Sequence, residues 1–512
     1  MSKYLYGAAV QGIQDYIFQT NELQDIIGAS ELVNEICTNL FKETVGTSFN
    51  EKHQVVAAAG NIKYEFDSKE ECEKVVRVFP KKVMEAAPGI TISQAVIEMN
   101  EENFGILVDD MEDKLSARRN RPMRSLTMGL MGIQRSRATG LPIVEPKYKE
   151  KLKDGKSQIP DLDKGENKDK KKKTDTNNLC LATFGDKVSA DKFPFNISDI
   201  CDKNNWVAVF HADGNGLGQI VQKIGKDKEK FSKFSKSLDA ATHAAAQAAY
   251  TVISEKYHFE TEPIIPIRPI VVGGDDFTVI CRGEFAIEYV AAYMENFEKE
   301  TEKKLSDIGV GADVPKKLTA CAGVAFIKAN YPFYYGYNLA EALCDAAKKD
   351  AKTDERMENG IAPSCLMFHK VQDSFVAGYD EIKKRELQPC ENVSYEFGPY
   401  YFKEYLERRK ENENKSIEYL INVVSQLADK DGSAIKSHLR QWMTIMADRG
   451  EEAASQHLAR LLSICKNKED LIKGIMNEEK ENKGKGVSKK KVYPVFDILS
   501  LCSVMNKTTN KK

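Results

Sequence analysis

The feature that constrains the fold most is a repeated order of predicted strands and helices. Residues 206–352 predict a strand, a helix, a hairpin, a helix, a strand and a last helix in succession. Residues 5–98 predict the same order more faintly, with a hairpin that turns at Gly60-Asn61. This β-α-β-β-α-β order is that of the split ferredoxin-like unit. The sequence therefore predicts two such units in one chain.

The remainder of the chain predicts helices. From about residue 380 onward, apolar residues recur at three- and four-residue spacing, which is typical of a helical bundle. A length of 512 residues leaves room for several cores. The predicted fold class is α+β, with two ferredoxin-like domains and a C-terminal helical bundle. The predicted boundaries are a first domain over 1–115, an inter-domain segment over 116–195, a second domain over 196–375 and a helical domain over 376–512.

Composition narrows the class of protein. The formal net charge is −2, so a nucleic-acid binder that works by bulk positive charge is not favoured. Lysines gather in residues 147–178 and 481–491, which predicts either solvated surface or local contact with phosphate or RNA. The eleven cysteines contain no C-x-x-C pair, the N-terminus shows no signal peptide, and no apolar run is long enough to span a membrane. We therefore expect a cytoplasmic protein with no membrane contact.

Two adjacent carboxylates stand at the tip of the predicted hairpin in the second unit, in Gly273-Gly274-Asp275-Asp276. Glycine provides the positive φ that such a turn needs, and a divalent cation would relieve the repulsion between the two acids. Asp213 ends the first strand of the same unit, which should be the neighbour of the hairpin, so we expect it to face Asp275. Carboxylate ligands favour Mg²⁺ or Mn²⁺, and two ions are expected. A lone Gly-Gly-Asp-Asp is often only a hairpin turn, and a lone Asp-Gly-Asn-Gly, as at Asp213, is often a turn or a segment that resembles a calcium loop. The two motifs together favour a metal site.

A glycine-rich turn follows the acidic strand end, in Gly214-Asn215-Gly216-Leu217-Gly218. Its N–H groups precede a predicted helix, so they can bind a triphosphate. Together with Gly273 and Gly274, these residues form the predicted nucleotide-binding turns.

Three further side chains are candidates near this site. Lys348 and Lys352 lie four residues apart on a predicted helix, where they would neutralise the β- and γ-phosphates or simply form a solvated helix face. His211 lies two residues before the acidic strand end, and we expect it to pack within the strand rather than act as a general base.

At these motifs the sequence resembles a known family, the large polymerase-cyclase subunit of type III CRISPR effector complexes. The resemblance spans about residues 4–371 with gaps. It rests on AAVQGIQDYIFQTNELQDIIGASELVNEI, HADGNGLG, IRPIVVGGDDFTVIC, LTACAGVAFIKANYPF and LAEALCDAAKKDAK. The family has two palm domains, related to GGDEF and adenylyl cyclase domains, which join ATP into cyclic oligoadenylates.

Carried over residue by residue, the resemblance implies that Asp213, Asp275 and Asp276 ligate the metals and catalyse. It also implies that Lys348 and Lys352 contact the triphosphate.

In the first palm, Ala8-Ala9-Val10 stands where the second palm has its acidic strand end, and Gly60-Asn61 replaces the paired acids. We expect this palm to bind a nucleotide without catalysing. The predicted contacts are Gln11, Gly12 and Gln14, the alternative being a helix-entry turn without a ligand.

Two departures from the family pattern change the expected activity. None of the seven histidines is followed by Asp, as an HD nuclease domain requires, so we expect no DNA cleavage. The segment Gly129–Pro146, where related proteins often hold zinc, has no cysteine. Its basic stretch Arg135-Ser136-Arg137 is either a solvated loop or a contact for RNA or phosphate.

The sequence thus predicts a metal-dependent nucleotidyltransferase that makes a cyclic oligonucleotide second messenger for antiviral defence. The 3′-OH of a nucleotide on the first palm would attack the α-phosphate of one on the second, and pyrophosphate would leave. ATP is the expected substrate, and guide RNA and CRISPR effector subunits are the expected partners. The rival hypothesis is a scaffold subunit whose palms serve as a platform.

Overall fold

The computed structural model describes residues 3–58, 60–87, 89–99, 104–121, 178–201, 204–224, 227–306, 315–353, 355–358, 360–373, 378–428, 430–477, 479–481 and 490–505. The segment 129–146, with its basic stretch, lies outside the described residues. So do nearly all of the lysine-rich segment 147–178 and most of 481–491.

The first ferredoxin-like unit is a four-stranded antiparallel sheet in the order β2-β3-β1-β4. Apolar residues on one face of this sheet pack against the helices that connect its strands, and α5 packs on the other face. The elements are β1 (Lys3–Gln11), α1 (Ile13–Ile17), α2 (Leu23–Glu35), α3 (Phe41–Val45), β2 (Gln54–Ala58), β3 (Asn61–Phe66), α4 (Lys69–Ala86), β4 (Thr91–Met99) and α5 (Phe104–Arg119).

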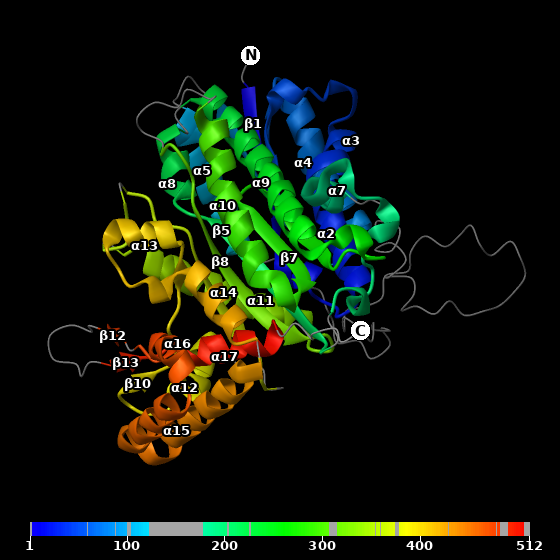
Figure 1. Cartoon of the computed structure of the whole chain (residues 1–512). Coiled ribbons are helices and arrows are strands. Elements are labelled where there is room, and N and C mark those ends of the chain that lie inside the picture. The colour runs from blue at the N-terminus through cyan, green and yellow to red at the C-terminus, as the bar shows by residue number, and fades with distance from the viewer. Residues whose placement is uncertain are drawn as a thin grey trace, which may run out of the picture.

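The second unit repeats this topology in a six-stranded sheet of order β11-β9-β8-β5-β7-β6. Figure 1 shows α9 and α10 lying side by side across one face of it, and α11 covers the opposite face. The elements are α7 (Asn178–Phe184), β5 (Trp206–Gly214), α8 (Leu217–Ile224), α9 (Lys228–Tyr257), β6 (Ile267–Gly273), β7 (Asp276–Arg282), α10 (Ala286–Ser306), β8 (Ala320–Lys328), α11 (Phe333–Ala351), β9 (Cys365–Lys370) and β11 (Tyr400–Tyr401).

Both faces of β5 are apolar because both are covered. Phe210 belongs to the core beneath α9 and α10, whereas Val207 and Val209 belong to the core beneath α11. This arrangement confirms the predicted α+β class. It also adds β9, which pairs parallel to β8 and was not predicted as a strand.

The two units pack against each other through α11, and also where α9 lies against β2 and α2 against β6. The ring of Phe18, at the end of α1, stacks on the ring of Tyr337 at a centroid distance of 4.6 Å. The N–H of Phe333 donates to Asn21 Oδ1 over 3.1 Å. Because the first unit and α11 share one hydrophobic core, the two sheets hold a fixed relative position.

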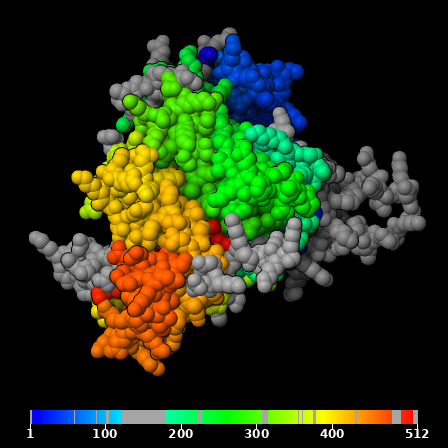
Figure 2. All heavy atoms as spheres, in the orientation of Figure 1, coloured from blue at the N-terminus to red at the C-terminus, as the bar shows by residue number. Residues whose placement is uncertain are grey.

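The C-terminal region is mainly helical, as predicted, and Figure 1 shows it below the second sheet. Figure 2 shows the same region, in yellow to red, at the lower end of the molecule. It also contains a small sheet of order β10-β13-β12 that the sequence did not predict. Among the described residues, no helix has the length and apolar character to cross a membrane. The elements are α12 (Tyr379–Glu386), β10 (Val393–Ser394), α13 (Lys403–Arg409), α14 (Ile417–Gln426), α15 (Lys430–Ile464), α16 (Glu469–Ile475), β12 (Glu479–Glu481), β13 (Lys490–Val492) and α17 (Val495–Val504).

A buried carboxyl group joins α17 to the second sheet and predicts a pH-dependent stability. The hydroxyl of Tyr400 donates to Asp497 over 2.8 Å. Burial, which outweighs this hydrogen bond, raises the pKa of Asp497 to about 8, and Glu396 acts in the same direction. Because the folded pKa lies above the ordinary value, the stabilising contribution of protonated Asp497 is full below pH 3.8 and is lost as the pH rises towards about 8.

We therefore expect Asp497→Asn to remove part of this pH dependence, because asparagine is neutral throughout. As the pH rises across this range, the free energy of unfolding of the variant should increase relative to that of the parent by about 1.4 kcal/mol per pH unit. The thermal midpoint of the variant should therefore rise relative to that of the parent. Scanning calorimetry measures this difference. The exposed Asp448→Asn on α15 is the matched control, and parallel curves for all three proteins would contradict the prediction.

Candidate metal and nucleotide site

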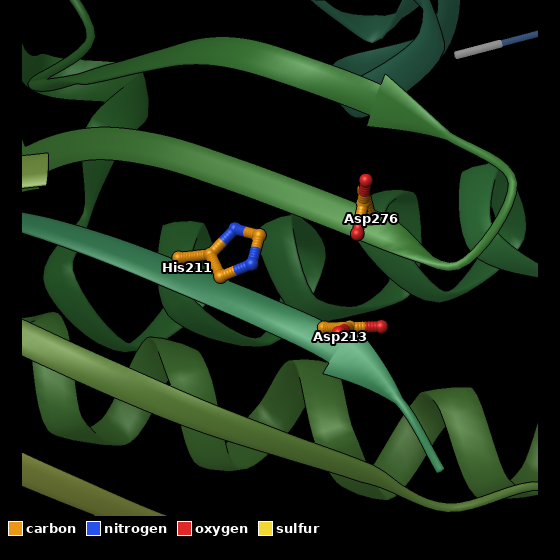
Figure 3. Close-up of side chains that lie close together, drawn as sticks. All are labelled: His211, Asp213 and Asp276. Atoms are coloured by element: carbon orange, nitrogen blue, oxygen red, sulfur yellow. The ribbon is translucent and has the colours of Figure 1, made fainter. Parts of the chain in front are cut away.

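Three side chains that could ligate a metal lie together at one end of the second sheet. His211 and Asp213 come from β5, and Asp276 begins the neighbouring strand β7, as Figure 3 shows. One ligand atom from each lies within 4.8 Å of the others. The paired register of β5 and β7 runs to Ala212 opposite Phe277, which places the two aspartates one step further along, on the face that α11 covers. The strand adjacency expected from the sequence is therefore observed.

The hairpin tip that carries Asp275 is fixed from the other face of the sheet by α9. Asp239 Oδ1 accepts a hydrogen bond from the N–H of Gly274 over 3.1 Å, and the hydroxyl of Thr242 donates to the carbonyl of the same glycine over 2.5 Å. Gly274 has a φ of +62°, as a tight turn of this kind requires. A Cβ on Gly214 would lie 2.9 Å from Cβ of Asp275, so only glycine lets the two segments approach this closely.

The carboxylates of this site repel one another. Burial, followed by the charges of the neighbouring aspartates, raises the pKa of Asp275 and of Asp276. The ammonium of Lys348 contacts the carboxylate of Asp213 and donates to the carbonyl of Gly214 over 3.2 Å. Burial opposes the charge of this lysine, but Asp213 outweighs burial, so the pKa of Lys348 is raised. Because the single ammonium of Lys348 stands beside three aspartates, the site has an excess of negative charge when these acids are ionised.

His211 is buried, and its Nδ1 lies 2.9 Å from the hydroxyl of Thr278 on β7. Burial lowers the pKa of His211 to about 4, so the ring is neutral at neutral pH. The ring of Tyr337 packs edge-on against it at a centroid distance of 5.7 Å. The predicted packing role fits these contacts, and the neutral imidazole also lies within reach of a metal.

The glycine-rich turn lies next to the acids, with Gly216 and Gly218 open to solvent beside the start of α8 at Leu217. Asn215 differs from its predicted role. Its amide donates to Thr319 Oγ1 over 3.1 Å and its N–H to the carbonyl of the same residue over 2.8 Å. These donors are committed within the protein, so Asn215 anchors the turn to Thr319, which directly precedes β8, rather than offering them to a nucleotide.

The two predicted lysines are separated. Lys348 is half-buried at Asp213, whereas Lys352 is exposed at the C-terminal end of α11. The structure therefore brings only Lys348 to the acidic site.

The first unit has no acid at the corresponding positions. Its hairpin closes with Ala58 opposite Asn61, as the second closes with Gly273 opposite Asp276. Since Asn61 pairs with Ala9, alanine stands where the second unit has Asp213.

The predicted nucleotide turn of the first unit lies at the start of α1. Gly12 precedes this helix with a φ of +60°, and the side-chain amide of Gln11 donates to the carbonyl of Ala9 over 3.2 Å. Among the described residues, Oε1 of Gln14 is buried without a hydrogen-bond partner. Asp15 from the same helix acts electrostatically on Glu341 of α11, so the turn lies on the side of the first unit that faces the second.

The acidic residues fit a divalent cation. The two carboxylates are the oxygen donors that Mg²⁺ or Mn²⁺ prefers, whereas the neutral imidazole of His211 suits other divalent metals better. The negative charge of the acids is only partly balanced by Lys348. The sequence missed Asp239 and Thr242, because their spacing on an alanine-rich helix indicates only that this face packs on the sheet.

Comparison with known proteins agrees with this geometry. Residues 206–357 match the family model of the second palm domain of Cas10/Cmr2. No curated protein sequence matches the chain. The solved Csm1–Csm4 cassette in complex with cA4 has a TM-score of 0.58 and 11% identity, covering 99% of this chain and 70% of that one. The Csm1–Csm4 subcomplex of the type III-A CRISPR-Csm interference complex has a TM-score of 0.56 and 12% identity, covering 98% and 69%.

Csm1 in T. onnurineus has a TM-score of 0.51 and 13% identity, covering 99% of this chain and 69% of that one. For the cassette in complex with AMPPNP, the covered share of that chain is 53%. At such identities the likeness shows the fold. The second sheet is thus similar to the second palm domain of Cas10/Cmr2, and the overall fold of the chain is similar to that of Csm1.

Proposed function

We propose that this chain is a metal-dependent nucleotidyltransferase that joins NTPs, ATP foremost, through 3′–5′ phosphodiester bonds into a cyclic oligonucleotide messenger of type III CRISPR-like antiviral defence. The observation that carries the proposal is the acidic site of His211, Asp213 and Asp276, on a domain that matches the Cas10/Cmr2 second palm. Similar folds solved with cA4 and with cA3 support the ligand class.

In this proposal Asp213, Asp275 and Asp276 hold one or two divalent cations. Such ions, when bound, supply charge neutralisation at the transferring phosphate and a lower pKa for an attacking hydroxyl. The N–H groups of the turn at Gly216–Gly218 bind the triphosphate, and Lys348 donates to it from α11. The first palm positions the 3′-OH of the second nucleotide, a proximity effect, through the turn at Gln11–Gln14.

Purified protein incubated with each NTP and with Mg²⁺ or Mn²⁺ tests the proposal. We expect pyrophosphate release and a cyclic product that mass spectrometry resolves, with ATP the best substrate. Parallel reactions with target RNA and effector subunits show whether these partners are needed. Absence of both pyrophosphate and cyclic product under every one of these conditions would refute the proposal.

A scaffold role is the second candidate, because solved chains with this fold form a cassette with a partner, Csm4. A double variant, Asp275→Ala with Asp276→Ala, separates the two. A scaffold keeps its assembly and its protection against phage when these acids are removed, whereas a synthase keeps its assembly and loses product.

A further inference from the structure

A cluster of positive charges surrounds Trp206, at the end of β5 opposite the acidic site. The ammonium of Lys328 lies 3.9 Å from the centroid of the indole ring, and that of Lys370 lies 4.7 Å from it. The sheet imposes this proximity, because Lys328 pairs with Trp206 across β5 and β8 while Lys370 pairs with Phe326 across β8 and β9. We call these side chains, with Arg440 and Lys436, the Trp206 cluster.

Two cations from the C-terminal region complete the cluster. Lys436 and Arg440 are one turn apart on α15, and both act electrostatically on Cys502 of α17. Arg440 is close enough to Lys370 to act on its pKa, so α15 brings its charges towards the strand ends. The cluster therefore spans the joint between the second palm and the C-terminal helices.

The charges of this cluster lack carboxylate partners among the described residues. Burial lowers the pKa of Lys370 to about 8, and the two charges that also act on it, Lys328 and Arg440, are both positive. Lys436 is only 9% exposed, and within the described part of the chain no ion pair or hydrogen bond reaches its ammonium. Lys328 donates to the carbonyl of Asn204 over 2.7 Å, which is a neutral partner. Cations that gather without a counter-charge repel one another, so an external anion would stabilise this arrangement.

The contacts of these side chains with the Trp206 ring and with the carbonyl of Asn204 do not neutralise the cluster, and neither does the acidic site. The C-terminal end of α17 provides about half a negative charge, which cannot balance four cations. β5 separates Trp206 from Asp213 by seven residues, or about 23 Å at 3.3 Å per residue, so the cluster does not contact a nucleotide bound at the acids.

We propose that the Trp206 cluster binds consecutive phosphate groups of a single-stranded nucleic acid, RNA being the form to which we commit. Several closely spaced cations match a chain that carries one permanent negative charge per nucleotide. Trp206 is 8% exposed, so its ring orients the lysines rather than stacking on a base. The contacts are therefore to the backbone, and binding does not depend on base sequence.

The test uses the full chain with EDTA and without NTP, so its outcome is independent of any synthase activity. Fluorescence anisotropy with a labelled RNA of about 20 nucleotides, at several KCl concentrations, compares the parent with Lys328→Gln plus Arg440→Gln. Both residues are exposed, which favours an intact fold. We expect affinity at low salt to fall at least about tenfold, and the salt slope to decrease by about 1.4, or 0.7 for each lost phosphate contact.

The matched control is Lys299→Gln plus Lys303→Gln on α10, which removes the same charge from lysine side chains that are 63% and 71% exposed. This control should bind RNA as the parent does. If the double variant is unstable, Arg440→Gln alone replaces it, and its salt slope should decrease by about half as much. Equal binding by parent and double variant, an equal loss in the control, or no binding by the parent would each overturn the proposal.

Competitors identify the ligand chemistry. Competition by single-stranded DNA of the same sequence, or by tripolyphosphate at matched charge, supports recognition of phosphate. Displacement of RNA by polyglutamate at an equal charge concentration, lost in the double variant, would assign the surface to an acidic protein partner and overturn the nucleic-acid assignment.

Discussion

Asp276→Asn is expected to abolish product formation while leaving the protein at least as stable as the parent. Asparagine keeps the volume of the side chain but removes one of the buried charges that raise the pKa values of Asp275 and Asp276. Loss of that charge weakens cation binding, and charge stabilisation of the transferring phosphate by bound cations is worth several kcal/mol. We expect kcat to fall on the order of 10³-fold. The thermal midpoint should stay constant or rise, because repulsion among the acids decreases.

Three measurements distinguish this expectation from a structural effect. Pyrophosphate release gives the rate, electron paramagnetic resonance gives Mn²⁺ affinity without turnover, and scanning calorimetry gives the thermal midpoint. Asp448→Asn, on an exposed face of α15, is the control that should change none of them. If Asp276→Asn kept both its rate and its Mn²⁺ affinity, these acids would only close the hairpin turn.

Most of the fold could be predicted because its signals are local. The alanine-rich stretch of α9 and the glycines before Asp275 mark a helix and a hairpin without knowledge of the rest of the chain. β9 was missed because its sequence, CLMFHK, has four consecutive apolar residues followed by two basic ones, which leaves no alternation to detect. The strands β10 and β12 are two and three residues long, too short for any periodicity.

The acids of the site could be predicted from topology, since a β-α-β-β order makes β5 the neighbour of the hairpin strand β7. The residues that fix these acids in place could not be predicted, because their contacts join positions far apart in the chain. Asn215 reaches Thr319, 104 residues away, and the helix pattern of α11 shows which face Lys348 occupies but not that it contacts Asp213.

A large loss of stability is expected from Gly323→Ala in β8. Gly323 pairs with His211 and faces α11, whose backbone approaches so closely that a Cβ would overlap the carbonyl oxygen of Ala340 and lie 2.5 Å from the nitrogen of Cys344. Backbone atoms cannot rotate aside as a side chain can, so the helix must move away from the sheet. Overpacking of this kind costs about 3 kcal/mol or more. We expect a clear fall in the thermal midpoint, measured by calorimetry.

The consequence for the site follows from the position of Lys348, which α11 carries two turns beyond the clash at Ala340. Displacement of the helix moves the ammonium away from Asp213, so Gly323→Ala should also bind Mg²⁺-ATP more weakly at temperatures where it is folded, as isothermal titration calorimetry would show. Gly218→Ala, where a Cβ meets no atom within 4 Å, is the control for stability and should unfold at or above the parent's midpoint. Equal midpoints for the parent and Gly323→Ala would mean that α11 can move without loss of packing. In that case, the packing of α11 against β8 would not determine the position of Lys348 beside the acids.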